Sequence, residues 1–299
     1  MALWTLWLGC SGCPTPGVGA LAPAARGDDW LRPIALDSGG LPRTASVHVP
    51  SGPRPAGGWP LVVLFHGGQG ESGEDGRKMA AHWDHLRDQG FAMVFPNAIG
   101  TGARAWAGPD DRRDVTFTDD LIAWLDREIG VDEARVYAAG FSNGSGFTWM
   151  LQCVDADKFA GFGHVQQSMA APVLERCAPT RHAPNIWFHG DADSKAEWDG
   201  NRDTIGVPRT LDYVLGFDGC DPSVTRVTPW PDAADDGTTV TRTVYPNCRH
   251  VGALELFRIH GGVHHWPTDQ PSRSRRAGAC RDVDAATEMV RFWREHAGL

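Results

Sequence analysis

Residues 140–144 read Gly-Phe-Ser-Asn-Gly and place Ser142 between two glycines in a G-x-S-x-G pattern. Small residues on both sides permit the sharp strand-to-helix turn that lifts a nucleophilic hydroxyl off the edge of a sheet. The flanks fit such a turn, because residues 135–139 are typical of a strand and residues 145–151 of a helix. The pattern predicts that Ser142 is a nucleophile. The alternative is a serine in an ordinary strand-to-helix turn.

A serine hydroxyl needs a general base to take its proton and an acid to orient that base. Two segments offer these groups. Residues 189–193, His-Gly-Asp-Ala-Asp, follow a predicted strand that ends at residue 188, and residues 261–267, Gly-Gly-Val-His-His-Trp-Pro, follow one that ends at residue 259. Active-site groups of an open α/β sheet lie at the carboxyl ends of its strands. The order serine, acid, histidine is that of the α/β-hydrolase fold.

Residues 66–70, His-Gly-Gly-Gln-Gly, follow a buried strand predicted over residues 61–65. Backbone amides must come within about 3 Å of a substrate oxygen to stabilise an oxyanion, and glycines allow that approach. We expect the two donors to be the amides of Gly68 and of Asn143, the residue after the serine. A phosphate-binding loop is the alternative, but the Gly-Lys-[Ser/Thr] that completes one is missing.

Two other groupings fit a metal site only in part. His260 and His264 are four residues apart, but the glycines between them oppose the helix that would bring both to one ion. Residues 199–210 start like a calcium loop, yet Thr204 and Thr210 stand where glycine and glutamate are needed. We predict no required metal and no cofactor.

The elements around these segments alternate between strand and helix. Strands are predicted over residues 44–49, 61–65, 91–95, 135–139, 162–165, 185–188, 225–229, 239–245 and 254–259, and helices over 72–89, 118–129, 145–151, 208–215 and after residue 284. Residues 44–49 alternate as an edge strand does, Thr118 is expected to cap its helix, and Asp282 or Asp284 the last one. The β-α-β-α order predicts an α/β fold, a mostly parallel sheet with helices on both faces. We expect one catalytic domain over residues 27–299.

The composition and the first residues indicate class and compartment. The 28 Lys+Arg and 37 Asp+Glu residues give a net charge of −9, which argues against nucleic acid as a partner. The apolar residues 1–8 are too short to span a bilayer, so we predict no transmembrane segment. Leu8-Gly9-Cys10 is close to the pattern at which bacterial lipoproteins are cut and acylated. We therefore expect residues 1–26 to be an export leader with a lipid anchor at Cys10. The alternatives are a disordered tail or a metal or redox pair of Cys10 with Cys13.

The remaining cysteines suit an oxidising compartment. Their spacing favours two local disulfides, Cys153 with Cys177 and Cys220 with Cys248. Cys280 is left over and is either free or paired with Cys13, because spacing alone does not determine connectivity.

Together these motifs resemble secreted esterases of the α/β-hydrolase fold, a family of feruloyl esterases, acetyl xylan esterases and polyhydroxybutyrate depolymerases. The likeness covers about residues 40–296 and rests on the segments 61–67, 114–117, 131–137, 140–144, 189–193 and 261–267. It implies that Asp193 is the acid and His264 the base of a catalytic triad with Ser142. Asp191 and His265 are the alternative assignments, and Asp114 is expected to be structural.

The chain departs from the family pattern where substrate would be chosen. Val263 stands where the family usually has glycine, His265 where it commonly has threonine, and residues 194–199 replace a common Val-Pro-Tyr. Trp266 and Trp198 are the expected aromatic substrate-binding residues. Trp106 is a further candidate, for which core packing is an equal alternative.

We therefore expect a secreted or cell-surface serine carboxylesterase, acting as a monomer on carboxylic esters such as feruloyl or acetyl esters of plant polysaccharide. A polyester depolymerase of the same family is the first alternative. A non-catalytic surface binding protein and a serine peptidase on the same fold are the others.

Overall fold

The computed structural model describes residues 30–68, 76–100, 105–251, 253–270 and 277–299. The predicted leader over residues 1–26, with Cys10 and Cys13, lies outside them. The described residues build one ten-stranded sheet in the order β1-β2-β4-β3-β5-β6-β7-β10-β9-β8. The strands are β1 (Arg32–Ser38), β2 (Leu41–His48), β3 (Trp59–Phe65), β4 (Ala92–Pro96), β5 (Val131–Phe141), β6 (Gly161–Val165), β7 (Asn185–Gly190), β8 (Arg226–Pro229), β9 (Thr239–Tyr245) and β10 (Leu254–His260).

The middle of this sheet is parallel and its edges are antiparallel. Strands β4, β3, β5, β6, β7 and β10 run in one direction. The pair β1–β2 closes one edge and the hairpin β8–β9 the other. All residues of β3 and β4 are buried, which explains their continuous apolar sequences. The predicted mostly parallel α/β-hydrolase sheet is confirmed.

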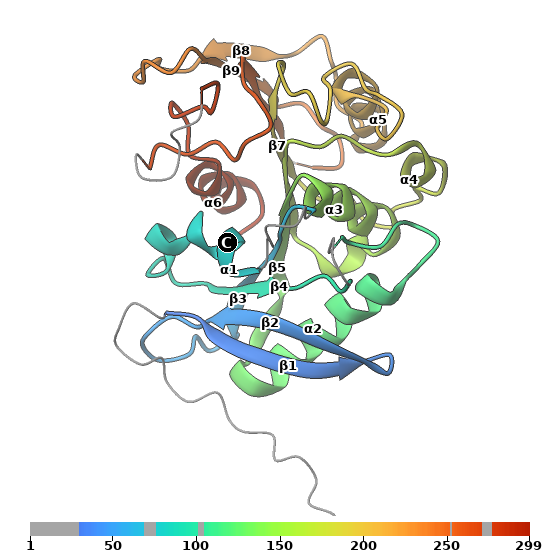
Figure 1. Cartoon of the computed structure of the whole chain (residues 1–299), viewed down its shortest axis with the longest axis vertical. Helices are drawn as coiled ribbons and strands as arrows, with labels where there is room; N and C mark the ends of the chain where they lie inside the picture. Colours follow the sequence, from blue (N-terminus) through green and yellow to red (C-terminus); the bar gives the residue numbers. More distant parts are fainter. Residues whose placement is uncertain (1–29, 69–75, 101–104, 252, 271–276) are drawn as a thin grey trace, which may run out of the picture.

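Helices cover both faces of the sheet (Figure 1). One face carries α1 (Gly76–Ala81) and α6 (Ala285–His296), and the other carries α2 (Arg113–Ile129), α3 (Asn143–Val154), α4 (Ala171–Glu175) and α5 (Val207–Asp218). Two short 3₁₀ helices, η1 (Asp84–Leu86) and η2 (Ala156–Lys158), complete the described elements. Two apolar cores result, one under α2, α3 and α5, and one under α1 and α6. Because both faces are covered, chemistry is left to the loops at the strand ends.

The first strands differ from the sequence prediction. Residues 44–49 were expected to form an edge strand, but β2 starts at Leu41 and lies between β1 and β4. The edge strand is β1, which no pattern had predicted. Its residues alternate only partly between buried and exposed positions, because an edge strand near the surface buries little of either face.

Two helices also begin or end at other residues than expected. In the described part of the helix predicted over residues 72–89, from residue 76 on, the structure has the six-residue α1, followed by a turn and η1. The prediction that Thr118 caps a helix is wrong, because α2 already starts at Arg113 and the Thr118 hydroxyl donates to the Asp114 carbonyl inside it. A buried ion pair holds this earlier start: the Asp114 carboxylate accepts from Arg43 at 2.6 Å and from the Ala107 amide at 2.7 Å. The structural role expected for Asp114 fits these contacts.

The last helix resolves the alternative between two capping aspartates. Asp284 caps α6, since its carboxylate accepts from the Thr287 amide at 2.8 Å. Asp282 instead accepts from the amides of Ala233 and Ala234 and so holds the loop after β8.

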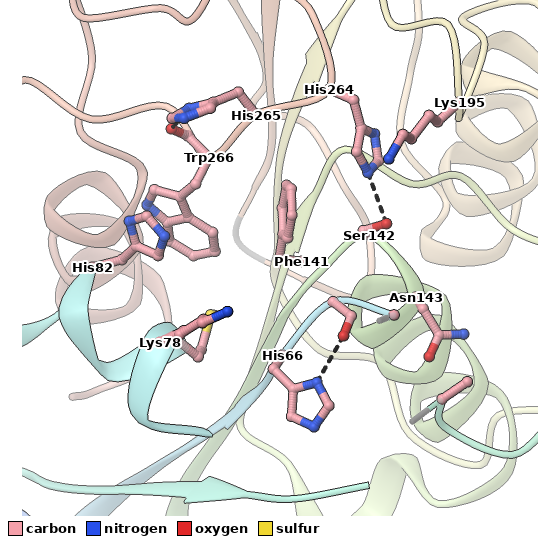
Figure 2. Close-up of a pocket in the computed structure, with 14 residues that line it drawn as sticks. His66, Lys78, His82, Phe141, Ser142, Asn143, Lys195, His264, His265 and Trp266 are labelled. Atoms are coloured by element: carbon pink, nitrogen blue, oxygen red, sulfur yellow. Dashed lines mark hydrogen bonds between the residues drawn. The ribbon is translucent and has the colours of Figure 1, made fainter. Parts of the chain in front are cut away.

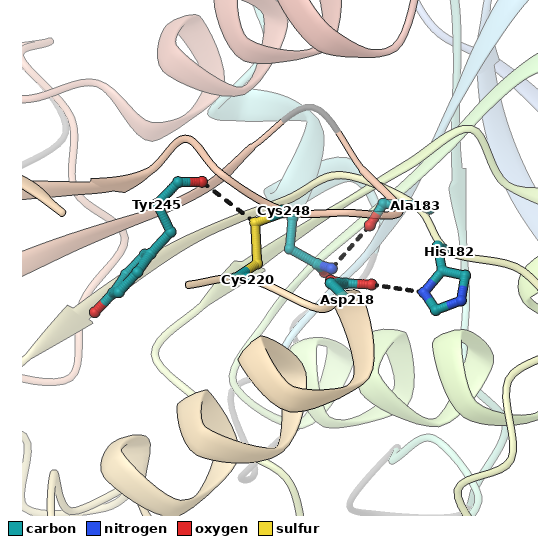
Figure 3. Close-up of a disulfide and its surroundings, with 7 residues drawn as sticks. His182, Ala183, Asp218, Cys220, Tyr245 and Cys248 are labelled. Atoms are coloured by element: carbon teal, nitrogen blue, oxygen red, sulfur yellow. Dashed lines mark hydrogen bonds and ion pairs between the residues drawn. A yellow bond between two sulfur atoms is a disulfide. The ribbon is translucent and has the colours of Figure 1, made fainter. Parts of the chain in front are cut away.

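Both predicted disulfides are present, Cys153–Cys177 and Cys220–Cys248. The second joins the end of α5 to the segment after β9 (Figure 3). Next to it, burial raises the pKa of Asp218 to about 6, although the hydrogen bond with His182 opposes that rise. Cys280 is a buried free thiol among the described cysteines. No helix in the described ranges combines the length and the apolar character that crossing a bilayer requires.

Candidate active site

Ser142 occupies a strained turn between β5 and α3. Its φ of 52° lies in the left-handed region, which non-glycine residues rarely adopt. Glycine is required on both sides. A Cβ on Gly140 would lie 2.3 Å from the Gly144 carbonyl carbon, and one on Gly144 would lie 2.3 Å from the Phe65 carbonyl oxygen. The turn therefore depends on close backbone contacts that only glycine permits, and it presents the serine hydroxyl at the first turn of a helix.

Ser142, His264 and Asp193 form one hydrogen-bonded chain. The His264 Nε2 lies 2.8 Å from the Ser142 Oγ (Figure 2). The His264 Nδ1 lies 2.7 Å from the Asp193 Oδ2. A carboxylate can only accept, so Nδ1–H donates to Asp193 and Nε2 accepts from the serine hydroxyl. The three residues follow β5, β7 and β10, and they meet because these strands are parallel and end at the same edge of the sheet.

Asp193 is held as a buried anion. Burial by itself would raise its pKa. The hydrogen bond from His264 and those from the amides of Ala196 and Lys195, at 2.9 and 2.8 Å, outweigh burial and leave the pKa below its ordinary value. The side chain of Asp193 has no exposed surface and that of His264 is 10% exposed. The pair can therefore orient one imidazole tautomer while keeping the carboxylate ionised.

The alternative residues take part in other contacts. Asp191 binds Arg258, His260 and the Gly261 amide. His265 lines the same cavity as Ser142, but its Nδ1 donates to the Trp266 carbonyl at 2.8 Å.

The two segments expected to bind an oxyanion lie against each other. A Cβ on Gly68 would be 3.1 Å from the Cβ of Asn143, so the two backbones approach closely. The side-chain oxygen of Asn143 accepts from the Trp106 amide at 2.8 Å, and the Trp106 indole donates to the His66 carbonyl at 2.8 Å. His66 itself donates from Nδ1 to the Gly67 carbonyl and accepts the Ala98 amide at Nε2. These bonds fix the loop after β3 beside the start of α3.

A cavity of about 610 Å³ opens in front of Ser142. Its lining combines backbone, cationic and aromatic groups: His66, Gly67, Gly68, Lys78, Met79, His82, Ala105, Phe141, Ser142, Asn143, Lys195, His264, His265 and Trp266. The volume suits an ester of drug-like size.

Of the three tryptophans considered for the substrate, the structure places one in this cavity. Trp266 lines it and stacks on His82, but this residue is only 2% exposed and most of it belongs to the core under α1 and α6. Trp198 does not line the cavity. It packs against His189, and the Arg258 guanidinium lies over its ring, 4.4 Å from the ring centre. Trp106 is buried against Phe147 and belongs to the core.

Three lining residues with charged or ionisable side chains had no role in the sequence analysis: Lys78, His82 and Lys195. Lys195 is exposed and follows Asp193 by two residues, so its position beside the predicted acid could have marked it. Lys78 lies in α1 and His82 directly follows it. Their positions in the cavity depend on how α1 packs against the sheet, which the local sequence does not show.

Among the described residues, one group of acids and histidines could converge on a metal ion: Glu255, Glu295 and His296. Both glutamates already bind Arg291, and none of the three lines the cavity. His260 and His264, which were considered as metal ligands, bind different aspartates.

The ten-stranded sheet with its covering helices defines an α/β-hydrolase fold, with a serine, a histidine and an aspartate joined at its strand ends. Comparisons with known proteins agree with this class. No family model matches the chain. NocK of Nocardia uniformis subsp. tsuyamanensis, a protein named as an esterase, is 28% identical over 85% of this chain and 79% of its own length.

Two further relatives have names that state which esters they act on. Feruloyl esterase B of Piromyces equi is 27% identical over 74% of this chain, and the bifunctional acetylxylan esterase/xylanase XynS20E of Neocallimastix patriciarum is 32% identical over 78% of it. The chain spans 42% and 34% of the length of these two relatives.

Solved structures show the same fold. A thermostable esterase matches with a TM-score of 0.60 at 18% identity, covering 90% of this chain and 63% of that one. The acetyl xylan esterase from Aspergillus awamori matches with a TM-score of 0.57 at 15% identity, covering 74% and 89%. The resemblance to this group of esterases is confirmed.

Proposed function

We propose that the chain is a serine carboxylesterase that works through an acyl-enzyme. The observation that carries the proposal is the hydrogen-bonded chain from Ser142 through His264 to Asp193, which starts at a strained turn facing a cavity. Relatives named as esterases support carboxylic esters as the substrates.

In the first half of the reaction, the Ser142 oxygen attacks the ester carbonyl carbon while His264 Nε2 takes the hydroxyl proton. Asp193 keeps Nδ1 protonated and stabilises the imidazolium that forms. The carbonyl oxygen becomes an oxyanion, which the amides of Gly68 and Asn143 stabilise. Collapse of this intermediate breaks the bond to the alcohol, and the departing oxygen takes the proton from Nε2.

In the second half, water enters where the alcohol was. His264 removes a proton from the water, the hydroxide adds to the acyl carbon, and the Ser142 oxygen leaves with that proton. The carboxylic acid is released and the free serine is restored. Phe141 lines the cavity as an apolar group against which an acyl group would pack, and the largely buried Trp266 packs against the Phe141 ring.

We further propose feruloyl or acetyl esters of plant polysaccharide as the substrates and an extracellular site of action. Feruloyl esterase B of Piromyces equi and XynS20E of Neocallimastix patriciarum, which are named for such esters, support the first point. The two disulfides support the second, because such bonds persist in oxidising compartments. Mass spectrometry of the mature protein tests anchoring: a diacylglyceryl group on Cys10 is expected, and an unmodified Cys10 would overturn the anchor.

A fluorophosphonate probe tests the serine mechanism. We expect the folded protein to be labelled on Ser142, as located by peptide mass spectrometry, and the Ser142→Ala variant to stay unlabelled. Ser145→Ala is the matched control, because this buried serine lies one turn along α3 and should leave labelling intact. Folded wild-type protein without label on Ser142 would remove the proposal and favour a non-catalytic binding role.

Competition in one assay defines the ester. Methyl ferulate, acetylated xylan and hydroxybutyrate oligomers are offered together with an amide reporter. Preference for ferulate or acetate is expected. Preference for the oligomers would indicate a polyester depolymerase, and comparable cleavage of the amide a peptidase.

A further inference from the structure

Among the described residues, two that are not glycine have a positive φ: Ser142 at 52° and Gln166 at 54°. The value at Ser142 belongs to the turn that presents the hydroxyl. Gln166 directly follows β6, the strand between those that lead to Ser142 and Asp193. Glycine would adopt this conformation without strain, so a glutamine here indicates that its side chain has a use.

The side-chain amide of Gln166 joins the two loops that carry His264 and Asp193. Its Nε2 donates to the carbonyls of Val263 and His265, at 3.0 and 3.1 Å, which are the residues on either side of the histidine. Its Oε1 accepts from the Gly190 amide at 2.9 Å, at the end of β7 where the loop to Asp193 begins.

The backbone around Gln166 reaches the third member of the site. The Gln166 amide donates to the Phe188 carbonyl at 2.9 Å, and the preceding residue, Val165, accepts from the Ser142 amide at 2.9 Å. Gln166 is 1% exposed and is absent from the cavity lining, so it does not contact a substrate there. It lies behind the site, between the segments that carry the three side chains.

We propose that Gln166 is a positioning residue that sets His264 at hydrogen-bond distance from both Ser142 and Asp193. This inference rests on the serine esterase function proposed above. A primary amide is the group that the position requires, because both of its hydrogens meet carbonyl oxygens and its oxygen meets an amide hydrogen. Glutamate has the same shape but no hydrogens for the two carbonyls, and it would face them with negative charge.

Two variants separate positioning from packing. Gln166→Glu keeps the volume and removes the donor. Gln166→Gly removes the side chain but also relieves the left-handed strain, which favours a folded protein. Gln152→Glu is the matched control, since Gln152 is a second buried glutamine, on α3, and lies outside the cavity lining.

The experiment counts active sites with the fluorophosphonate probe and measures kcat and KM per titrated site with a small activated ester. We expect kcat to fall roughly 10- to 100-fold in both Gln166 variants, because a displacement of about 1 Å in a catalytic group costs about that much, with KM within about twofold. Gln152→Glu should lower the melting temperature and leave kcat per site within about twofold.

A double-mutant cycle with Asp193→Asn gives a readout that a purely structural role would not move. If Gln166 acts by holding His264 to its aspartate, its loss should cost much less once that aspartate is gone. Losses that multiply in the double variant, or Gln166 variants with wild-type kcat per site, would overturn the inference. A wild-type protein that neither cleaves esters nor takes the probe would instead overturn the proposed function.

Discussion

Two aspartate–histidine pairs in this protein make nearly the same hydrogen bonds. Their aspartates are two residues apart in the sequence and their histidines four. His264 bridges Asp193 and the Ser142 hydroxyl at 2.7 and 2.8 Å. His260 bridges Asp191 and the Thr241 hydroxyl at 3.1 and 2.9 Å. By residue type and distance alone, both are hydroxyl–imidazole–carboxylate chains.

Their surroundings differ. The side chains of Asp193 and His264 are 0% and 10% exposed, whereas those of Asp191 and His260 are 20% and 39% exposed. Asp191 also binds Arg258, which competes for its charge. Water and a neighbouring cation weaken the influence that a carboxylate exerts on its histidine.

The two hydroxyls differ even more. Ser142 stands in a left-handed turn before a helix and faces a cavity beside the close backbones of Gly68 and Asn143. Thr241 lies within strand β9 and does not line that cavity. A hydrogen-bonded chain of this kind is therefore not enough for catalysis. The site also needs a hydroxyl lifted off the edge of the sheet, a cavity for the substrate and hydrogen-bond donors for the oxyanion.

Replacement of the proposed nucleophile should have the largest effect. We expect Ser142→Ala to lower kcat about 10⁴- to 10⁶-fold, because removal of a triad serine leaves only binding and oxyanion stabilisation. Thr241→Ala should keep ester hydrolysis within about twofold, as measured with an activated ester. Comparable losses in the two variants would show that the hydrogen-bonded chain of Thr241, His260 and Asp191 also contributes to catalysis.

Replacement of the two aspartates in turn tests which of them acts as the acid. Asp193→Asn should lower kcat about 10⁴-fold, because an amide cannot hold the same histidine tautomer. Asp191→Asn has the same change of shape and charge two residues away, and its kcat should stay within about threefold. Steady-state kinetics on both variants, with circular dichroism to establish folding, makes the measurement. A larger loss at Asp191 would reverse the assignment of the acid.

The smallest effect concerns stability at Asp191. Burial by itself would raise its pKa, but the Gly261 amide, Arg258 and His260 outweigh burial and lower it. A lowered carboxyl pKa stabilises the folded state above the unfolded pKa of about 3.9, and this stabilisation is lost as the pH falls through the folded pKa. Since the partners are partly exposed, Asp191→Asn should lower the free energy of unfolding at pH 7 by less than about 1 kcal/mol. Urea unfolding at pH 7 and pH 3 tests this, and a difference that persists unchanged at pH 3 would contradict it.

Much of this arrangement was predictable from local patterns. Buried strands read as continuous apolar runs, and the glycines around Ser142 and after β3 marked backbone that approaches other groups closely. Parallel strands end at one edge, so polar residues after three such strands were expected to meet. The resemblance to known esterases then favoured Asp193 and His264 over their neighbours.

Other features had no local signal. Strand β1 has weak alternation because it lies at an edge, and the start of α2 depends on the buried pair of Arg43 with Asp114, 71 residues apart. Trp198 reads like a substrate-binding residue but packs beside the site instead.

Which chemical groups follow which strands could be predicted from short segments, because apolar periodicity and glycine placement are local properties of the chain. Which histidine reaches Ser142, the exposure of the second hydrogen-bonded chain and the place of Gln166 behind the site became clear from the folded chain alone. Those outcomes depend on burial and on contacts between segments up to 122 residues apart. Hydrogen bonds of about 3 Å between such segments follow from how the sheet and its loops pack, which no short stretch of residues encodes.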